Sequence, residues 1–326
     1  MSEKRLKQGS HLDPGDPTVE IPDPLNWSQG RREAFSSPAM ETFRSVLRLE
    51  GHGDIRSAIV DDLATYHHLS IEDTVRRAVN WESWSVEEWQ TERRDTEQGL
   101  VRFYQETQSW AFDLLWYAYL QAEGFHYPVS VAIAVCLGMD GGASGLTHLD
   151  FGSGAGVTAQ FFGALGCEST MADISTSLLA FSRFRLERRG IAGTKFIDLN
   201  QEPLPTAAFD VITAIDTLAH VPDLKSAAAN LHRALKPGGM LFANFDVRPP
   251  SAENAWHLYD DDLPLRWILH RTGFEQVTSL DGFSIQYRRV PPRGLAHLIR
   301  GLRDLVLLRS PLRRAYRWAA HHLRHA

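Results

Sequence analysis

The stretch Leu149-Asp150-Phe151-Gly152-Ser153-Gly154-Ala155-Gly156-Val157 is the starting point for interpreting this 326-residue chain. Its pattern predicts the end of a buried strand, a glycine-rich turn and the start of a helix. Glycine has no Cβ, so the backbone can turn tightly and approach a ligand closely. The first turn of the following helix offers unpaired N–H groups and the positive end of the helix dipole. The stretch therefore predicts a site for a nucleotide-like cofactor, the alternative being a turn that binds no ligand.

The spacing of the glycines separates the possible cofactors. Dinucleotide-binding turns carry G-x-G-x-x-G, whereas Gly152, Gly154 and Gly156 form G-x-G-x-G and Val157 stands where the third glycine is required. A carboxylate such as that of Asp150 suits a cofactor with a positive charge or an amino group better than a pyrophosphate. No Gly-Lys-Ser/Thr follows, which excludes a P-loop.

This turn resembles motif I of the class I S-adenosylmethionine (SAM) dependent methyltransferases. Four segments further along the chain resemble later parts of the same family. The segments, in the order that the family shows, are 171–175, 198–199, 209–223 and 235–242. The resemblance covers about residues 145–289 and implies SAM as the cofactor. The same region alternates strands and helices, which predicts an α/β fold, a parallel sheet with helices on both faces. The family adds a final antiparallel hairpin, so we expect a Rossmann-like, mostly parallel sheet of seven strands.

The resemblance also implies which residues hold the cofactor. Asp173 ends the second strand, where the family binds the ribose hydroxyls, and Asp198-Leu199 lies where it contacts the adenine. Asp216 follows the fourth strand and is predicted to bind the methionine end of the cofactor or its amino group. The full predicted set is Asp150, Gly152, Ser153, Gly154, Gly156, Asp173, Ile174, Asp198, Leu199 and Asp216.

Two residues are candidates for catalysis. Methyl transfer from a sulfonium is an in-line displacement, so the protein must position a nucleophile and exclude water, and a general base can remove the acceptor's proton. Asp216 and His220 are the candidate groups, with a structural role as the alternative for His220. Ala219 replaces the glutamate that often precedes this histidine in the family, which weakens an acid–histidine mechanism. His67-His68 has no partner motif, so no metal site is predicted.

Absent motifs narrow the acceptor. Residues 215–218 are not the Asn-Pro-Pro-Tyr motif that binds planar amines in nucleobase or glutamine methylation. No Pro-Cys nucleophile for cytosine C5 chemistry is present, and no pair of acids indicates the divalent metal of catechol-type enzymes. We expect a small-molecule, glycan or lipid-linked acceptor, methylated at oxygen. Three further residues are expected near the pocket from their position in the sequence alone: Tyr104, His257 and Tyr259. A non-catalytic SAM-fold scaffold that docks through its basic tail, and a NAD-type oxidoreductase, are the alternatives.

Four regions are expected along the chain. Residues 1–35 are rich in Pro and Asp and are predicted to be a disordered leader. Residues 36–140 have helical periodicity and are interpreted as a substrate-side cap; they include a helix over 71–79 that begins after Ser70, a second start at Ser85, and the longest helix over 100–121. Residues 141–290 form the SAM-binding domain, and residues 291–326 form a basic amphipathic tail.

Charge is distributed unevenly. The segment from Arg288 onward contains ten arginines and one acid, so it carries +9 while the chain as a whole carries −6. Such asymmetry suggests an anionic partner, and we expect either peripheral contact with an anionic membrane or packing of the tail on the body. Nucleic acid is disfavoured, because the acidic body repels phosphate. Two cysteines outside any metal-like or redox-like pair, and no secretory signal, favour the cytoplasm.

Overall fold

The computed structural model describes residues 12–16, 18–20, 22–91, 97–139, 145–247, 258–291 and 299. Seven strands form one sheet in the order β3-β2-β1-β4-β5-β7-β6. The pairings from β3 through β5 are parallel, and β7 runs antiparallel to both β5 and β6. The strands are β1 (Thr147–Phe151), β2 (Glu168–Asp173), β3 (Lys195–Asp198), β4 (Phe209–Ala214), β5 (Leu235–Ala243), β6 (Phe274–Leu280) and β7 (Ser284–Arg289). The predicted Rossmann-like sheet with its final antiparallel hairpin is confirmed.

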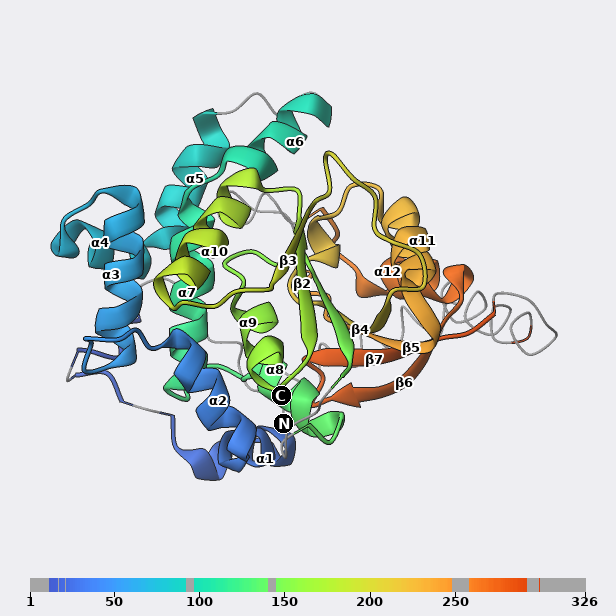
Figure 1. Cartoon of the computed structure of the whole chain (residues 1–326), viewed down its shortest axis with the longest axis horizontal. Helices are drawn as coiled ribbons and strands as arrows, with labels where there is room; N and C mark the ends of the chain where they lie inside the picture. The colour runs from blue at the N-terminus through green and yellow to red at the C-terminus, as the bar shows by residue number, and fades with distance from the viewer. Residues whose placement is uncertain are drawn as a thin grey trace, which may run out of the picture.

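Helices cover both faces of this sheet (Figure 1). On one face lie α9 (Val157–Ala164) and α10 (Thr176–Arg188), and on the other lie α11 (Leu224–Ala234) and α12 (Asp262–Thr272). Successive strand residues point to opposite faces, so Val211 packs with the core on the α9 side and Ile212 with the core on the α11 side. The helix α12 ends at Gly273, whose φ of 111° favours glycine.

The strand order reverses between β1 and β4. The chain moves outward from β1 through β2 to β3, and then returns to pair β4 with the other side of β1. In open α/β sheets the crevice for a ligand lies beyond the carboxyl ends of the strands at such a reversal. The glycine-rich turn follows β1 at this edge, so the fold places it where a cofactor would bind.

The segment before the sheet is helical. Its elements are η1 (Pro24–Asn26), α1 (Gln29–Ser36), α2 (Pro38–Leu47), α3 (Ile55–His67), α4 (Ile71–Val79), α5 (Trp81–Thr91), α6 (Glu97–Glu106), α7 (Ser109–Ala122) and α8 (Val129–Cys136). The helix α4 has the predicted bounds, because the Ser70 hydroxyl accepts a hydrogen bond from the Asp73 N–H at 3.1 Å and caps its first turn. We call α2 to α8 the cap.

Two details of the predicted cap are wrong. Ser85 does not start a helix: it lies buried inside α5, and its hydroxyl donates to Ser109 at 2.7 Å. The single helix expected over 100–121 is broken into α6 and α7. The break is stabilised by Glu88 of α5, whose carboxylate accepts the N–H groups of Gln108 and Ser109 at 3.0 and 3.1 Å. When the side chain that satisfies the first N–H groups of a helix comes from another helix, the local sequence gives no signal of it.

The expectation of an unpacked leader up to residue 35 is wrong for its described part. The helix α1 begins at Gln29 and buries Arg31 and Ala34. Further upstream, the Asp13 carboxylate pairs with Arg56 at 2.6 Å, and the Trp116 indole N–H donates to the Leu12 carbonyl at 2.9 Å. These contacts join the leader to the cap. They also give hydrogen-bond partners to two polar groups of the cap, the Arg56 guanidinium and the Trp116 indole N–H.

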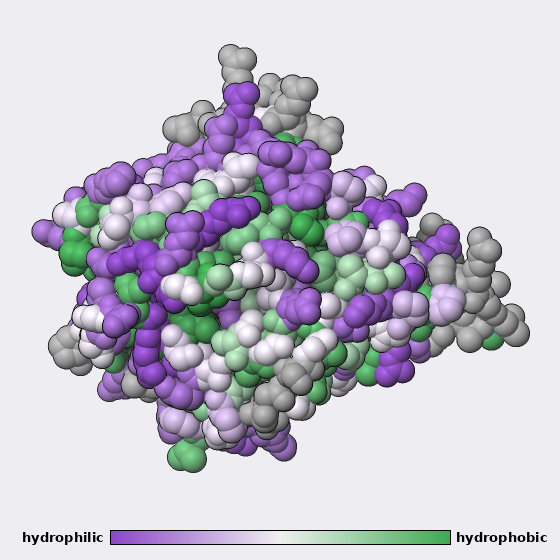
Figure 2. All heavy atoms as spheres, viewed as in Figure 1, coloured by the Kyte–Doolittle hydropathy of each residue, from purple (hydrophilic) through white to green (hydrophobic). Residues whose placement is uncertain are grey.

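The predicted basic tail over 291–326 lies outside the described residues except for residues 291 and 299. Within the part of the chain that the structure describes, no helix combines the length and apolarity needed to cross a membrane. Figure 2 shows hydrophilic residues spread over the viewed face, with small hydrophobic patches between them. The large hydrophobic side chains that are exposed are scattered: Leu25, Ile71, Ile191, Val277, Phe283 and Ile299.

Candidate functional site

The glycine-rich turn has an alternating backbone. Gly152, Gly154 and Gly156 have φ values of 71°, 51° and 73°, a left-handed conformation that other residues adopt only at a cost. The N–H of Gly154 donates to the Asp173 carboxylate at 2.8 Å. On the other side of the turn, the Gly154 carbonyl accepts from the Ser182 hydroxyl at 2.9 Å. The turn is therefore held between β2 and α10.

All three glycines also allow other parts of the protein to approach; at Gly156 the near neighbour is Met171 of β2. A Cβ at Gly152 would lie under 3.0 Å from Thr217, and one at Gly154 would lie under 3.0 Å from Leu114 Cδ1 of α7. The missing Cβ atoms were predicted to leave room for a ligand. The structure shows that the cap helix α7 needs the space at Gly154 as well.

Asp150, which was predicted to bind the cofactor, is bonded to other parts of the protein. Its carboxylate is buried and accepts the Thr213 hydroxyl at 2.8 Å and the Ala159 N–H of α9 at 3.2 Å. Burial raises the pKa of Asp150 to about 7. The Thr213 hydroxyl also bonds to the fully buried ring of His148, Oγ1 to Nε2 at 2.9 Å. Asp150 thus fixes the start of α9 on the sheet.

Asp173 lies at the end of β2, beside the turn. It is 7% exposed, and besides the Gly154 N–H it accepts the Ser175 N–H at 2.8 Å. Burial raises its pKa above the ordinary value, while these backbone donors oppose the shift. A carboxylate offers about four lone-pair sites, so Asp173 retains acceptor capacity for the hydroxyls of a ribose.

Asp198 ends β3, directly beside Asp173 in the strand register. Its carboxylate accepts the Asn200 N–H at 2.9 Å and the Gln201 side-chain amide at 2.9 Å. Asn200 in turn accepts the side-chain amide of Gln105 from α6 at 2.8 Å. Leu199 and Ile174 follow the two strands, so the structure brings the predicted ribose and adenine residues together under α6.

Asp216 follows β4 and has a φ of 50°, which is strained for a non-glycine residue. It is paired reciprocally with Asn244, which follows β5. The Asn244 side-chain oxygen accepts the Asp216 N–H at 2.6 Å, and the Asn244 amide donates to the Asp216 carboxylate. Asn244 was not predicted, although its place directly after a parallel strand was the available signal.

His220 lies in the short 3₁₀ helix η2 (Leu218–His220), which follows Asp216. Residues 258 and 259 contact this part of the chain: the Leu258 N–H donates to the Ala219 carbonyl at 3.3 Å, and the Tyr259 hydroxyl donates to the Val221 carbonyl at 2.9 Å. His220 and Asp216 therefore occupy the same edge of the sheet, as their sequence positions predicted. His257, the third residue placed near the pocket by position, lies outside the described residues.

The residues present fit a cofactor such as SAM. The Ser153 hydroxyl in the turn is buried and has no partner within the described part of the chain. Two carboxylates lie at the same edge on either side of β1: Asp173 ends β2, and Asp216 follows β4. Such a set can bind a ligand with hydroxyls and a positive charge.

An aromatic cluster of the cap lies next to this set. Trp89 of α5 and Phe103 of α6 have ring centroids 4.8 Å apart, and Trp110 of α7 lies 5.2 Å from Tyr104. Ile174, directly after Asp173, packs against this cluster. Burial raises the pKa of Tyr104 well above its ordinary value, and the charge of Tyr259 adds to this. The aromatics thus form both a small core and a wall beside the site.

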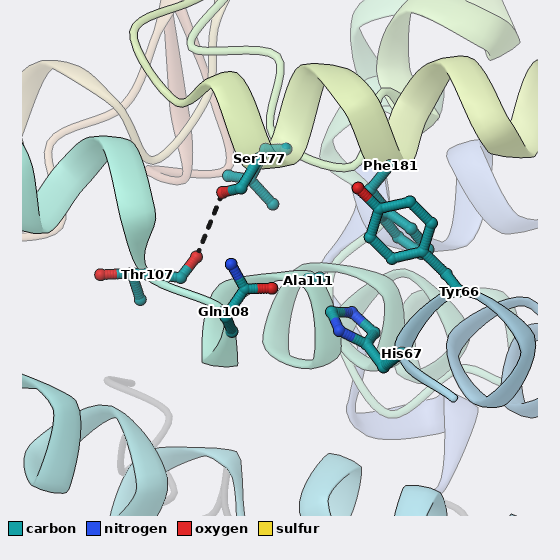
Figure 3. Close-up of a pocket in the computed structure, with 8 residues that line it drawn as sticks. Tyr66, His67, Thr107, Gln108, Ala111, Ser177 and Phe181 are labelled. Atoms are coloured by element: carbon teal, nitrogen blue, oxygen red, sulfur yellow. Dashed lines mark hydrogen bonds between the residues drawn. The ribbon is translucent and has the colours of Figure 1, made fainter. Parts of the chain in front are cut away.

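A second contact between the cap and the sheet domain is lined by residues of α3, α7 and α10. Figure 3 shows a recess in which Tyr66 and His67 of α3 face Phe181 of α10. At its other end the Ser177 hydroxyl donates to the Thr107 carbonyl at 3.5 Å. Burial lowers the pKa of His67 to about 4, so this ring is neutral near pH 7. The recess holds no charged group and is a packing contact between α3 and α10.

Comparisons with known proteins identify the type of domain. Residues 149–241 match the family model described as "Methyltransferase domain". A ubiquinone/menaquinone biosynthesis C-methyltransferase UbiE from Marinomonas sp. (strain MWYL1) is 35% identical over 130 residues, 38% of this chain and 51% of that protein. A ubiquinone biosynthesis O-methyltransferase from Pseudomonas paraeruginosa is 34% identical over 118 residues, 34% of this chain and 49% of that protein. The chain thus spans about half the length of these relatives.

Among solved structures, a SAM-dependent methyltransferase from Mesorhizobium loti is 18% identical, with a TM-score of 0.39, over 50% of this chain and 97% of that chain. The [4+2]-cyclase SpnF is 22% identical, with a TM-score of 0.38, over 45% of this chain and 60% of that chain.

Proposed function

Because this chain contains a class I SAM-dependent methyltransferase domain, we propose that it transfers a methyl group from SAM to a hydroxyl oxygen of a small-molecule acceptor. The observation that supports this most is the convergence, at the reversal of strand order, of the glycine turn with Asp173, Asp198 and Asp216. A doubly wound sheet binds ligands at this edge.

Each group has a distinct role in this proposal. Asp173 accepts the ribose hydroxyls, and the amides of the turn and the Ser153 hydroxyl bind the polar end of the cofactor. Asp216 holds the amino group as an ion pair, because its position is fixed by Asn244. When bound, SAM supplies an electrophilic methyl group on a sulfonium leaving group. His220 removes the acceptor's proton as the new oxygen–carbon bond forms.

The acceptor is an apolar, ring-bearing hydroxyl compound, either free or lipid-linked. The supporting feature is the aromatic wall of Tyr104 and Trp110 beside Ile174 and the cofactor residues. Aromatic side chains favour planar apolar rings, since they offer large apolar area and stacking geometry. The two relatives named above act in ubiquinone biosynthesis, one at carbon and one at oxygen. His220 favours oxygen, because a hydroxyl gains most from a base.

Binding of the demethylated cofactor, S-adenosylhomocysteine, tests the first step. Calorimetry should give a saturable signal for the wild type and a sharp loss of affinity in Gly154→Arg and Asp173→Ala. Gly190→Arg is the matched control, because Gly190 is also left-handed (φ 63°) but has no heavy atom near its Cβ position. The absence of any signal in the wild type would reject SAM binding.

Turnover on a panel of hydroxylated aromatic rings, with and without an isoprenoid chain, tests the chemistry. Mass analysis of the product identifies the methylated atom. His220→Ala should lower kcat about 100-fold, in the range for loss of a general base, and leave binding of the cofactor product intact. Methylation at ring carbon with no effect of His220→Ala would overturn the assignment to oxygen.

Contact of residues 291–326 with an anionic membrane remains a proposal from the charge pattern. Flotation of full-length protein with anionic liposomes, compared with a chain that ends near Val290, tests it. Equal flotation of the two would reject the tail as the anchor.

A further inference from the structure

A buried arginine connects the glycine turn to the cap. Arg185 of α10 has an exposed fraction of 0%. Its Nη1 donates to the carbonyl of Ala155, inside the turn, at 2.8 Å. Its Nε donates to the carboxylate of Asp62, in the cap helix α3, at 3.2 Å. One guanidinium therefore bonds at once to the cofactor turn and to the cap.

Asp62 is the centre of a larger ion-pair network. It is fully buried and also accepts Nη1 of Arg188 at 2.9 Å and Nη2 of Arg189 at 2.7 Å. Arg189 continues to the carbonyls of Val46 and Leu47, at the end of α2. The three arginines are spaced i, i+3 and i+4, so they lie on one face of α10; Arg189 is the residue directly after this helix. The network thus links two cap helices to the turn.

Stability alone does not explain this arrangement. A buried ion pair costs desolvation that its Coulombic attraction often fails to recover, and apolar replacements are frequently as stable. Arg185 carries an added cost, because its Nη2 has no partner within the described part of the chain. Burial lowers the pKa of Arg185 to about 10, and the group remains charged near pH 7. A buried cation with this cost, bonded to the glycine turn, suggests that Arg185 positions the backbone of the turn.

The geometry of the turn indicates what is positioned. The Gly154 amide faces Asp173, while the carbonyls of Gly154 and Ala155 accept from Ser182 and Arg185 of α10. Rotation of either carbonyl would also rotate the adjoining peptide N–H, because the peptide unit is planar. Arg185 therefore restrains the peptide unit that joins Ala155 to Gly156, whose N–H donates to the Ser153 carbonyl at 2.8 Å and closes the turn.

We propose that Arg185 is a positioning residue that holds the glycine turn in its cofactor-binding geometry, and that Asp62 of the cap orients Arg185. The cap and the cofactor site are thereby coupled, so that a change in the cap alters affinity for the cofactor without touching it. This inference rests on the proposed function in one respect, that the turn binds SAM.

Affinity for S-adenosylhomocysteine in the full chain tests the coupling. Asp62→Asn and Arg185→Lys should each weaken binding about ten-fold, equivalent to about 1.4 kcal/mol. Lysine keeps the charge but lacks the fork that bonds two acceptors in fixed directions. Arg188→Lys is the matched control: it alters the same network at Asp62 but touches no atom of the turn, and should stay within about two-fold. Asp62→Glu, which keeps the charge, should recover most of the affinity lost in Asp62→Asn.

Hydrogen exchange of the peptide over residues 152–160 is the second measurement, because it requires no cofactor. Exchange should be faster in Arg185→Lys than in Arg188→Lys. If wild type binds no S-adenosylhomocysteine, the proposed function fails and this comparison alone decides the positioning role. If Asp62→Asn does not fold, the two lysine variants decide. Equal effects of Arg185→Lys and Arg188→Lys, in affinity and in exchange, would overturn the proposal.

Discussion

Replacing Gly154 by alanine tests the close approach of α7 to the glycine turn. Two costs are expected. Left-handed backbone (φ 51°) costs an L-residue about 1 to 2 kcal/mol. The new methyl group would also lie under 3.0 Å from Leu114 Cδ1, and overpacking of this kind costs about 1 to 3 kcal/mol. We expect Gly154→Ala to lower the free energy of unfolding by about 2 to 5 kcal/mol.

The two costs are separable with three further proteins. Gly190→Ala carries the left-handed strain alone, because no heavy atom lies within 4 Å of its Cβ position. Leu114→Ala removes the clashing methyl group, so Gly154→Ala in this background should cost only about 1 to 2 kcal/mol. The coupling between positions 114 and 154 is therefore expected to be about 1 to 3 kcal/mol.

Urea unfolding of wild type, both single variants and the double variant gives this coupling directly. Residues without contact add within about 0.3 to 0.5 kcal/mol. Additivity within that margin would refute the packing of α7 on the turn, and a Gly154→Ala cost equal to that of Gly190→Ala would do the same. Calorimetry with S-adenosylhomocysteine on the same set shows whether relief of the clash also restores the site.

Three further outcomes are expected. Asp216→Asn keeps the pairing with Asn244 but removes the charge, so S-adenosylhomocysteine should bind about 10- to 100-fold more weakly at unchanged melting temperature; unchanged affinity would exclude an ion pair at Asp216. Ser153→Ala removes a buried, unpartnered hydroxyl, so it should leave stability within about 0.5 kcal/mol and weaken cofactor binding, as calorimetry would show. Burial lowers the pKa of His126 to about 4, so the unfolded chain protonates first below about pH 6.5, and stability is lost as the pH falls through this window. His126→Phe should flatten this fall in urea titrations between pH 7.5 and 4.5, and an unchanged slope would assign the loss to other groups.

The sheet and the cofactor edge could be predicted from the sequence because their signals are local. A buried strand, a glycine turn and a helix start occupy consecutive residues, and the carboxyl ends of parallel strands meet at one edge. Asp216 was identified by this logic, whereas Asp173 and Asp198 were named through the family resemblance; all three lie at or just after the carboxyl ends of parallel strands. Asp150 lies in the same stretch, but its side chain bonds to α9. Side chains alternate between the two faces of a strand, and Asp150 lies on the face that α9 covers.

The features that the sequence did not reveal depend on distant partners. The break between α6 and α7 needs Glu88 from α5, and the network at Asp62 joins residues more than 120 positions apart. The contact of Leu114 with Gly154 is equally non-local. Propensity and periodicity describe neighbours within one or two helical turns, so they carry no information about such pairs.

The network at Asp62 has a consequence for protein engineering. If the proposed function holds, recombining caps from different methyltransferases is a route to new acceptors, since the helices before the sheet carry the aromatic cluster beside Ile174. In this chain a transplanted cap must also bring an acid at position 62 for Arg185, and a side chain at position 114 that fits against Gly154. A chimera that keeps every acceptor contact but lacks these two would inherit the new specificity together with a misaligned donor site.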